Sequence, residues 1–451
     1  MLITPRFFSP ISLTIALAAG VVPVAAQQGA ASLRAGPMVG PAEMREVTLW
    51  AQTTRPARVR VVYWDSLAPT RRFTTAEVTT APATAYTAHL VADSVEPGRT
   101  YGYELRIDGV AVPRPYPLRF ATPPLWQWRT DPPTFRMALA SCFYVNDPAF
   151  DRPGTPYGSD YGILGALAAA KPDLMVWLGD NTYLREADWS SRRGILHRYT
   201  HTRALPELQA ALASMSHYAT WDDHDFGPND ADASYRDTPL TREAFDLFWP
   251  SGRRGVDGGS GVTSTFEWAD VQVFLLDNRS YRTANGRLTG TPAMLGERQV
   301  AWLINALRAS RAAFKLVAVG GQVLNSAPLF ENYVNLAAGE RERLLRAIQA
   351  ERIPGVVFLS GDKHWTELNR MERTGAYPLF ELTVSSLTAG VSKGFEREMN
   401  QYRIPETLLA EHNFGILEFS GPRTDRVMTI RIHDAAGAER WSRQIKASEL
   451  R

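Results

Sequence analysis

The sequence of 451 residues has a single cysteine, almost no net charge and only one long apolar run. Cys142 alone cannot form an intramolecular disulfide, so it is either an inert buried side chain or a ligand. The 49 basic and 47 acidic residues leave a net charge of +2, which gives no reason to expect a nucleic acid or an anionic membrane as a partner. The chain also has no internal repeat and no low-complexity tract. Its length of 451 residues and ordinary composition lead us to expect a globular protein with more than one domain.

The one apolar run lies at the N-terminus. Residues 1–26 contain one cation, Arg6, then the uncharged stretch 7–24, and they end in two alanines, which is the layout of a secretory signal peptide. Two prolines interrupt this run and it is short for a membrane span, although an uncleaved anchor remains the alternative. We therefore expect export to the periplasm or the extracellular space, with no transmembrane segment after signal removal.

The remaining chain divides in two by its hydrophobic pattern. Residues 31–125 contain short alternating runs separated by proline, glycine and threonine, a pattern typical of half-buried antiparallel strands. The Pro97-Gly98 corner resembles that of fibronectin type III domains and predicts an all-β, fibronectin III or Ig-like sandwich. After a proline-rich linker, residues 134–440 alternate between helical and strand patterns, which predicts an α/β catalytic domain.

Side chains that bind metals or phosphate follow several predicted strands. The central example is the apolar run 174–178, which ends in Gly179-Asp180 and is followed by Tyr183. The other strand ends carry Ser141-Cys142, Asp222-Asp223-His224-Asp225, Asp277-Asn278-Arg279 and Asp362-Lys363-His364. Open α/β sheets bind ligands at the carboxyl ends of their strands, and carboxylates gathered there repel one another unless cations neutralise them. The pattern therefore predicts a two-metal hydrolytic site.

Each of these segments has another reading when it is taken alone. Asp180 could cap a helix, residues 222–225 could form a solvated acidic turn, and Arg279 could belong to a structural ion pair. His197 and His201 lie four residues apart on a predicted helix rich in arginine, and we expect neither to bind metal. The metal site is favoured because all the segments occur together.

The motif series as a whole resembles the alkaline phosphatase D (PhoD-like) family of the calcineurin-like metallophosphoesterases. The resemblance rests on Ala140-Ser141-Cys142, Gly179-Asp180-x-x-Tyr183, Trp221 to Asp225, Leu276-Asp277-x-Arg279 and Ser360-Gly361-Asp362-x-His364. It extends from about residue 40 to 440, because that family also has an N-terminal β-sandwich. It implies a four-layer α/β/β/α sandwich in which two mixed sheets pack face to face.

The same resemblance implies two unlike metal ions. One would be held by Cys142, Asp180, Tyr183 and His364, and a set with thiolate, phenolate and imidazole suits Fe3+. The other would share Asp180 and be held by Asp223 and Asp362, an all-oxygen set that suits Ca2+ or another hard divalent ion. Cysteine and aspartate here replace histidines of ordinary metallophosphoesterases.

The catalytic roles implied by the resemblance follow from charge. A metal-activated hydroxide attacks phosphorus while Arg279 stabilises the phosphoryl oxygens. His224 protonates the leaving alkoxide, and Asp225 orients its ring.

The sequence therefore predicts an exported phosphohydrolase for small phosphate monoesters, with diesters as a further class. Two alternatives stay open: a phosphodiesterase acting on phospholipid or nucleic acid, and a catalytically silent binding protein with the same fold. A silent relative is expected to have lost ligands, whereas the predicted ligands are all present here.

Overall fold

The computed structural model describes residues 1–2, 31–250 and 253–451, apart from the side chain of Glu396. The predicted signal peptide, residues 1–26, therefore lies outside the described residues except for its first two. Within the described ranges, no helix is both long enough and apolar enough to cross a membrane.

The larger sheet has nine strands in the order β21-β20-β19-β10-β11-β12-β1-β2-β6. These strands are β1 (Leu33–Ala42), β2 (Val47–Thr53), β6 (Thr87–Ala92), β10 (Phe135–Ala140), β11 (Leu174–Leu178), β12 (Ser216–Thr220), β19 (Asn413–Ser420), β20 (Val427–Asp434) and β21 (Glu439–Lys446). β10, β11 and β12 run parallel, so their carboxyl ends lie at one edge. The apolar runs 414–419 and 426–432 predict an antiparallel strand pair, and this is confirmed, because β19 and β20 pair antiparallel along their whole length.

The second sheet has six strands in the order β13-β14-β15-β16-β18-β17. They are β13 (Ser264–Trp268), β14 (Val271–Leu275), β15 (Phe314–Val319), β16 (Val356–Ser360), β17 (Glu367–Arg373) and β18 (Ala376–Thr383). β14, β15 and β16 are parallel neighbours. All residues of β15 and β16 are buried, as expected for strands covered on both faces.

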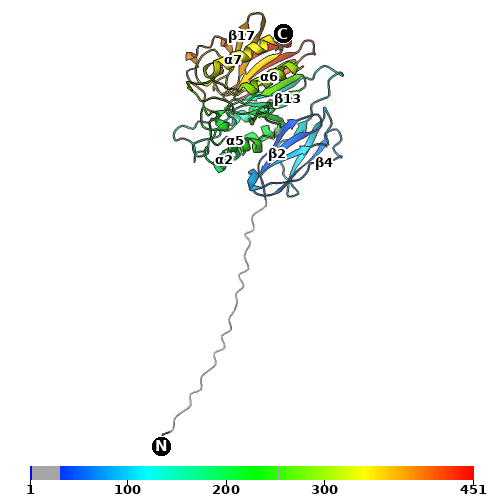
Figure 1. The fold of residues 1–451 in the computed structure, drawn as a ribbon. Coiled ribbons are helices and arrows are strands. Elements are labelled where there is room, and N and C mark those ends of the chain that lie inside the picture. The colour runs from blue at the N-terminus through cyan, green and yellow to red at the C-terminus, as the bar shows by residue number, and fades with distance from the viewer. Residues whose placement is uncertain (3–30, 251–252) are drawn as a thin grey trace. The chain divides into compact units, whose positions relative to one another are not determined.

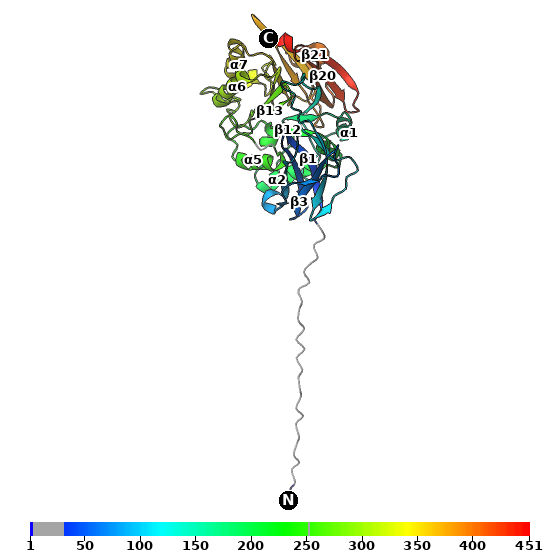
Figure 2. The ribbon, with the colours of Figure 1, turned by 90° about the vertical axis from the view of Figure 1, so that its right-hand side faces the viewer.

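Helices cover the outer faces of the two sheets. They are α1 (Gly162–Ala169), α2 (Arg192–Arg203), α3 (Gln209–Ser214), α4 (Asp223–Phe226), α5 (Thr238–Phe248), α6 (Glu297–Ala309) and α7 (Tyr333–Ala350). One core cluster joins Trp177 of the larger sheet to Ile195 of α2 and Phe245 of α5. Another joins Phe358 of the second sheet to Leu303 of α6. Figures 1 and 2 both show α6 and α7 at the opposite end of the molecule from α2 and α5.

The two sheets face each other across a third cluster, which contains Met137 and Val176 from one sheet and Val273 and Leu359 from the other. The layers thus run helices, sheet, sheet, helices, and the predicted mixed α/β architecture is confirmed.

The N-terminal strands share a sheet with the rest of the chain. β1 pairs parallel with β12 at Val39 and Ser216, so β1, β2 and β6 extend the larger sheet. They are faced by a third sheet, whose strands are β3 (Arg58–Asp65), β4 (Phe73–Thr74), β5 (Val78–Thr79), β7 (Thr100–Ile107), β8 (Val110–Ala111) and β9 (Arg119–Ala121). A sheet therefore crosses the predicted boundary between residues 31–125 and 134–440, and the chain from Ala31 to Arg451 is one compact unit.

The spacing of Leu344, Leu345 and Ile348 predicts a helix over residues 341–351, but α7 begins earlier, at Tyr333. The Asn332 side chain accepts a hydrogen bond from the Asn335 amide and so caps the N-terminus of the helix. The backbone leaves helical geometry at Ala337, with φ −151° and ψ 57°. This kink interrupts the apolar periodicity, so the sequence pattern indicates only the second part of the helix.

Candidate metal centre

Four predicted ligands lie on the turns that follow strands β10, β11 and β16. Cys142, Asp180, Asp362 and His364 all have positive φ, at 57°, 53°, 67° and 58°. Left-handed backbone at non-glycine residues costs roughly 1–3 kcal/mol each and is concentrated at functional sites. The two sheets therefore deliver these side chains through strained turns rather than through relaxed loops.

Gly179 makes the turn after β11 possible. Its φ is +100°, and a Cβ built on it would lie 2.7 Å from the Cβ of Asp222. Only glycine permits both this conformation and this approach. The turn thereby brings Asp180 against the segment that follows β12.

Three predicted ligands lie on one side of the Asp180 carboxylate: the sulfur of Cys142, the phenol of Tyr183 and the imidazole of His364. The Oδ2 atom of Asp180 lies 3.6 Å from Cys142 Sγ and 3.2 Å from the Tyr183 hydroxyl. That hydroxyl also lies 3.2 Å from His364 Nε2. Ser385 donates a hydrogen bond of 3.0 Å to the sulfur. Burial raises the pKa of the Cys142 thiol to about 12, so a nearby cation is needed to hold it as a thiolate.

Carboxylates and a second imidazole lie on the other side of Asp180. Donor atoms of Asp180, Asp223 and His224 fall within 4.8 Å of one another, and all three side chains are buried. Burial, followed by the charge of Asp223, raises the pKa of Asp180 well above its usual value. Burial opposes ionisation of Asp223 as well, but the charges of His224 and Arg279 hold its pKa below the usual value. Burial and neighbouring carboxylates raise the pKa of Asp362 to about 7.

These residues fit metal ions. Asp223 Oδ1 and His224 Nδ1 are buried and have no hydrogen-bond partner among the described residues. Buried polar atoms are normally paired, and several carboxylates in one buried site need positive charge. The first side offers sulfur, nitrogen and phenol, whereas the second offers mainly carboxylate oxygen, so the two halves favour different ions.

His224 lies between the two halves. Its ring stacks on that of Tyr183 with centroids 4.2 Å apart, and its backbone amide donates to Asp180 Oδ1 at 3.3 Å. Burial lowers the pKa of His224 to about 4, so the ring is neutral at pH 7. A neutral imidazole with a free Nδ1 is suited to bind a metal as well as to exchange a proton.

The predicted role of Asp225 as the residue that orients His224 has no support in the contacts. Its carboxylate instead accepts hydrogen bonds from the backbone amides of Asn181, at 3.0 Å, and Asp222, at 3.1 Å. Oδ2 closes the capping box with Asp222 at the start of α4, and Oδ1 accepts from Asn181 in the turn after β11. Asp225 therefore positions the strand ends rather than the imidazole ring.

Arg279 is buried inside an ion-pair network. Its guanidinium donates to Asp222 and to both oxygens of Glu331, and Arg282 donates to the same Glu331. The Arg279 side chain is only 1% exposed. The alternative of a structural ion pair thus describes its contacts better than the predicted contact with substrate.

Three residues near the site were not predicted. Glu331 lies in a loop and belongs to no motif, and Tyr157 precedes α1 in a loop without a pattern. Arg185 follows Tyr183 by two residues, so proximity in sequence was a signal for it.

His197 and His201 lie elsewhere on α2, where their Nε2 atoms contact Asp147 and the Asn146 carbonyl.

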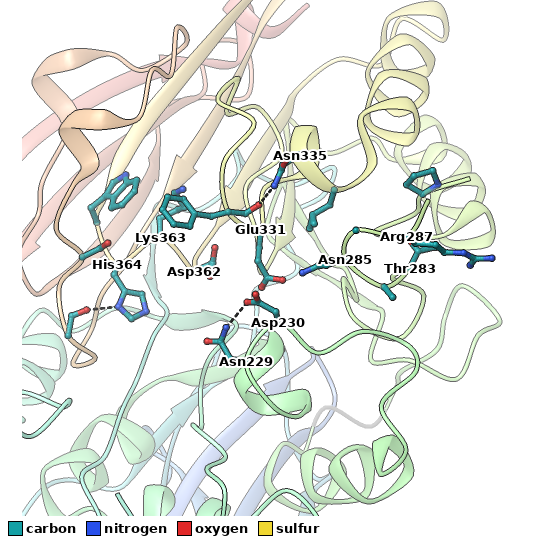
Figure 3. Close-up of a pocket in the computed structure, with 18 of the residues that line it drawn as sticks. Asn229, Asp230, Thr283, Asn285, Arg287, Glu331, Asn335, Asp362, Lys363 and His364 are labelled. Atoms are coloured by element: carbon teal, nitrogen blue, oxygen red, sulfur yellow. Dashed lines mark hydrogen bonds between the residues drawn. The ribbon is translucent and has the colours of Figure 1, made fainter. Parts of the chain in front are cut away.

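A cleft of about 1020 Å³ opens beside this centre. Figure 3 shows it extending from His364 past Asp362 and Glu331 to Asn285 and Arg287. Its walls combine polar side chains with aromatic ones, including Tyr157, Phe330 and Trp365. A cleft of this size is able to hold a small ligand with one end at the predicted ligands Asp362 and His364.

Two facing sheets that bring such a donor set to their carboxyl edges define a metallophosphoesterase fold. A solved structure of PhoD matches with a TM-score of 0.70 at 17% identity, over 90% of this chain and 91% of the other. Purple acid phosphatase PPD1 from yellow lupin (Lupinus luteus) seeds matches with a TM-score of 0.64 at 11% identity, over 92% of this chain and 74% of the other.

The chain belongs to the PhoD-like phosphatase family, which matches residues 137–421. A domain of unknown function (DUF7800) matches residues 30–124. Alkaline phosphatase D from Bacillus subtilis (strain 168) is 23% identical over 334 residues, which are 63% of this chain and 54% of that protein. The match thus spans about half of the relative's length.

Proposed function

We propose that this chain is an exported, metal-dependent hydrolase of phosphate monoesters, with phosphate diesters as a further substrate class. The supporting observation is the donor arrangement around Asp180. Cys142 and Tyr183 reach its carboxylate from one side, Asp223 and His224 share the other side, and the cleft opens beside them. Export is inferred from the N-terminal sequence, and the N-terminal strands are proposed to form a fibronectin III or Ig-like sandwich.

The ligand assignments follow the donor chemistry. Cys142, Asp180, Tyr183 and His364 would hold Fe3+, and Asp180, Asp223 and Asp362 would hold Ca2+ or another hard divalent ion. When bound, such ions supply positive charge for the phosphoryl oxygens and lower the pKa of water.

The chain's own groups then divide the remaining tasks. Asp180 holds the two halves at a common carboxylate, and the Ser385 hydroxyl orients the Cys142 sulfur. His224 is the imidazole that we assign to deliver a proton to the leaving alkoxide, because even the neutral ring carries one N–H proton and its Nδ1 is not held by a partner among the described residues. Arg279 keeps Asp222 and Glu331 in place, so it acts on the reaction through the carboxylates it holds.

Retention of the donor set favours an enzyme over a silent binding protein. The net charge of +2 gives little reason to prefer nucleic acid, which usually requires a basic stripe. Polar and aromatic side chains line the cleft together, which suits the alcohol part of a small phosphate ester.

Metal analysis combined with turnover tests the proposal. The purified protein is expected to contain iron and to hydrolyse an aryl phosphate monoester, and the matching diester serves as the second substrate. Absence of turnover on both esters in protein with its full metal content would refute the proposed function.

A further inference from the structure

Arg185 is buried beside the metal-binding residues inside a box of aromatic rings. The residue is 7% exposed, and its guanidinium lies 4.7 Å from the ring centroid of Tyr144, 5.4 Å from that of Tyr157 and 5.8 Å from that of Tyr183. Its Nε donates to the Tyr144 hydroxyl at 3.1 Å. Cation–π contacts offset part of the cost of burying this charge, but they leave the N–H groups of the two terminal nitrogens unused.

Neither terminal nitrogen of Arg185 has a protein acceptor among the described residues, whereas other buried arginines have an acceptor for at least one of theirs. Arg198 donates to Asp188 and Asp151, and Arg279 donates to Asp222 and Glu331. Arg341, which has no such carboxylate, donates from its terminal nitrogen to the Leu324 carbonyl. Buried cations normally need an anion, so the environment of Arg185 is incomplete without one.

The neighbours of Arg185 connect it to the site. Tyr183 lies between Asp180 and His364, with its hydroxyl 3.2 Å from each. Tyr157 lines the cleft, and its hydroxyl lies 3.4 Å from His364 Nδ1. Both of these rings contact the guanidinium, so it lies beside the cleft wall, and its terminal nitrogens, which are not among the fully buried polar atoms without a partner, keep some contact with solvent.

Arg279, which the sequence indicated as the cation for the phosphoryl group, is already committed to protein carboxylates. We propose that Arg185 binds an anionic phosphoryl oxygen of the substrate at the edge of Tyr157. This inference rests on the proposed phosphohydrolase function and adds a substrate-binding residue to it. A guanidinium is well matched to this task, because its planar fork donates two parallel hydrogen bonds to a phosphate.

Binding of inorganic phosphate to the full-length, metal-loaded protein tests the proposal by calorimetry. Arg185→Met keeps an unbranched apolar chain in place of the arginine stem but removes the fork, and it is expected to weaken phosphate binding roughly 10- to 100-fold, the range for loss of charge-assisted hydrogen bonds. Arg152→Met is the matched control. Arg152 is exposed and pairs with Glu186 at 2.7 Å, so its loss removes one charge from the same region and is expected to leave phosphate binding unchanged.

Arg185→Lys separates binding from a structural role. Lysine keeps the positive charge without the fork, so phosphate binding is expected to be intermediate between wild type and Arg185→Met. If Arg185→Met does not fold, this variant alone decides, and wild-type phosphate affinity in it would overturn the inference. Unchanged affinity in folded Arg185→Met of equal metal content would overturn it too, whatever the change in thermal stability.

The outcome is distinct from that of the proposed function. A wild-type protein that hydrolyses aryl phosphates while both Arg185 variants bind phosphate normally refutes only the role of Arg185. A wild-type protein that binds phosphate through Arg185 but hydrolyses neither ester refutes only the proposed function.

Discussion

The free energy of unfolding is expected to fall between pH 7 and pH 5, and it is expected to fall less when His217 is replaced by glutamine. His217 lies on β12, the strand that leads to the predicted ligand Asp223, and it is 1% exposed. Its Nδ1 accepts a hydrogen bond from Trp177 Nε1 at 3.1 Å, so the tautomer carries its proton on Nε2, which faces the Ala211 carbonyl at 3.1 Å. A second proton would have to replace the bond from Trp177 inside a buried site.

Burial accordingly lowers the pKa of His217 to about 3 from its usual 6.5. The unfolded chain takes up a proton near pH 6.5, whereas the folded chain does so only near pH 3. Stability from this residue is therefore present above pH 6.5 and is lost as pH falls toward 3. At about 1.4 kcal/mol per pH unit, the loss is about 2 kcal/mol between pH 7 and pH 5 and about 3 kcal/mol by pH 4.

Urea unfolding at pH 7, 6 and 5, under conditions of complete refolding, measures this effect. Wild type is expected to lose about 2 kcal/mol more than His217→Gln between pH 7 and pH 5. His433→Gln serves as the control, because the His433 side chain is only partly buried. Equal pH dependence in wild type and His217→Gln would show that His217 does not resist protonation in the folded state.

Three further predictions concern the site itself. Iron-loaded wild type is expected to show a visible charge-transfer band that Tyr183→Phe loses at equal iron content, and a colourless zinc protein would contradict the iron assignment. His224→Ala is expected to lower turnover of alkyl phosphates by roughly 100-fold or more while sparing activated aryl phosphates, as for loss of a general acid. Equal losses on both substrates together with a lower metal content would identify His224 as a ligand instead. Glu331→Gln is expected to lower the free energy of unfolding by about 3–5 kcal/mol, because two buried arginines lose a charged partner. Urea unfolding measures that loss, and Glu342→Gln, which breaks only an exposed pair with Arg346, is expected to change stability by less than about 0.5 kcal/mol.

Local patterns predicted the strands of the catalytic part well. The apolar run 174–178 is β11, and the turn after it carries Asp180 as expected from its Gly-Asp ending. The apolar spacing of Leu303 and Leu307 likewise predicts a helix over residues 297–310, which is α6, and both side chains are buried. These elements bury continuous or regularly spaced apolar side chains, so their sequence contains the information directly.

Partners distant in sequence were harder to predict. Nothing in residues 31–125 indicates that β1 pairs with β12, because the pairing is made by backbone hydrogen bonds that any strand of matching geometry can form. Likewise, a motif shows that Arg279 lies near a strand end but does not show that Glu331, from an unpatterned loop, occupies its guanidinium.

The sequence by itself determined the order of the motifs, the alternation of helix and strand, and the presence of Cys142, Asp180, Tyr183 and His364 at strand ends. Only the tertiary structure decided which arginine is paired with protein carboxylates and which has terminal nitrogens without a protein acceptor. Arg279 is enclosed by carboxylates, whereas Arg185 stands among tyrosine rings with its terminal nitrogens unpaired by the described residues. The physical reason is that the role of a buried charge depends on the charges that surround it, and the folding of distant segments brings those together.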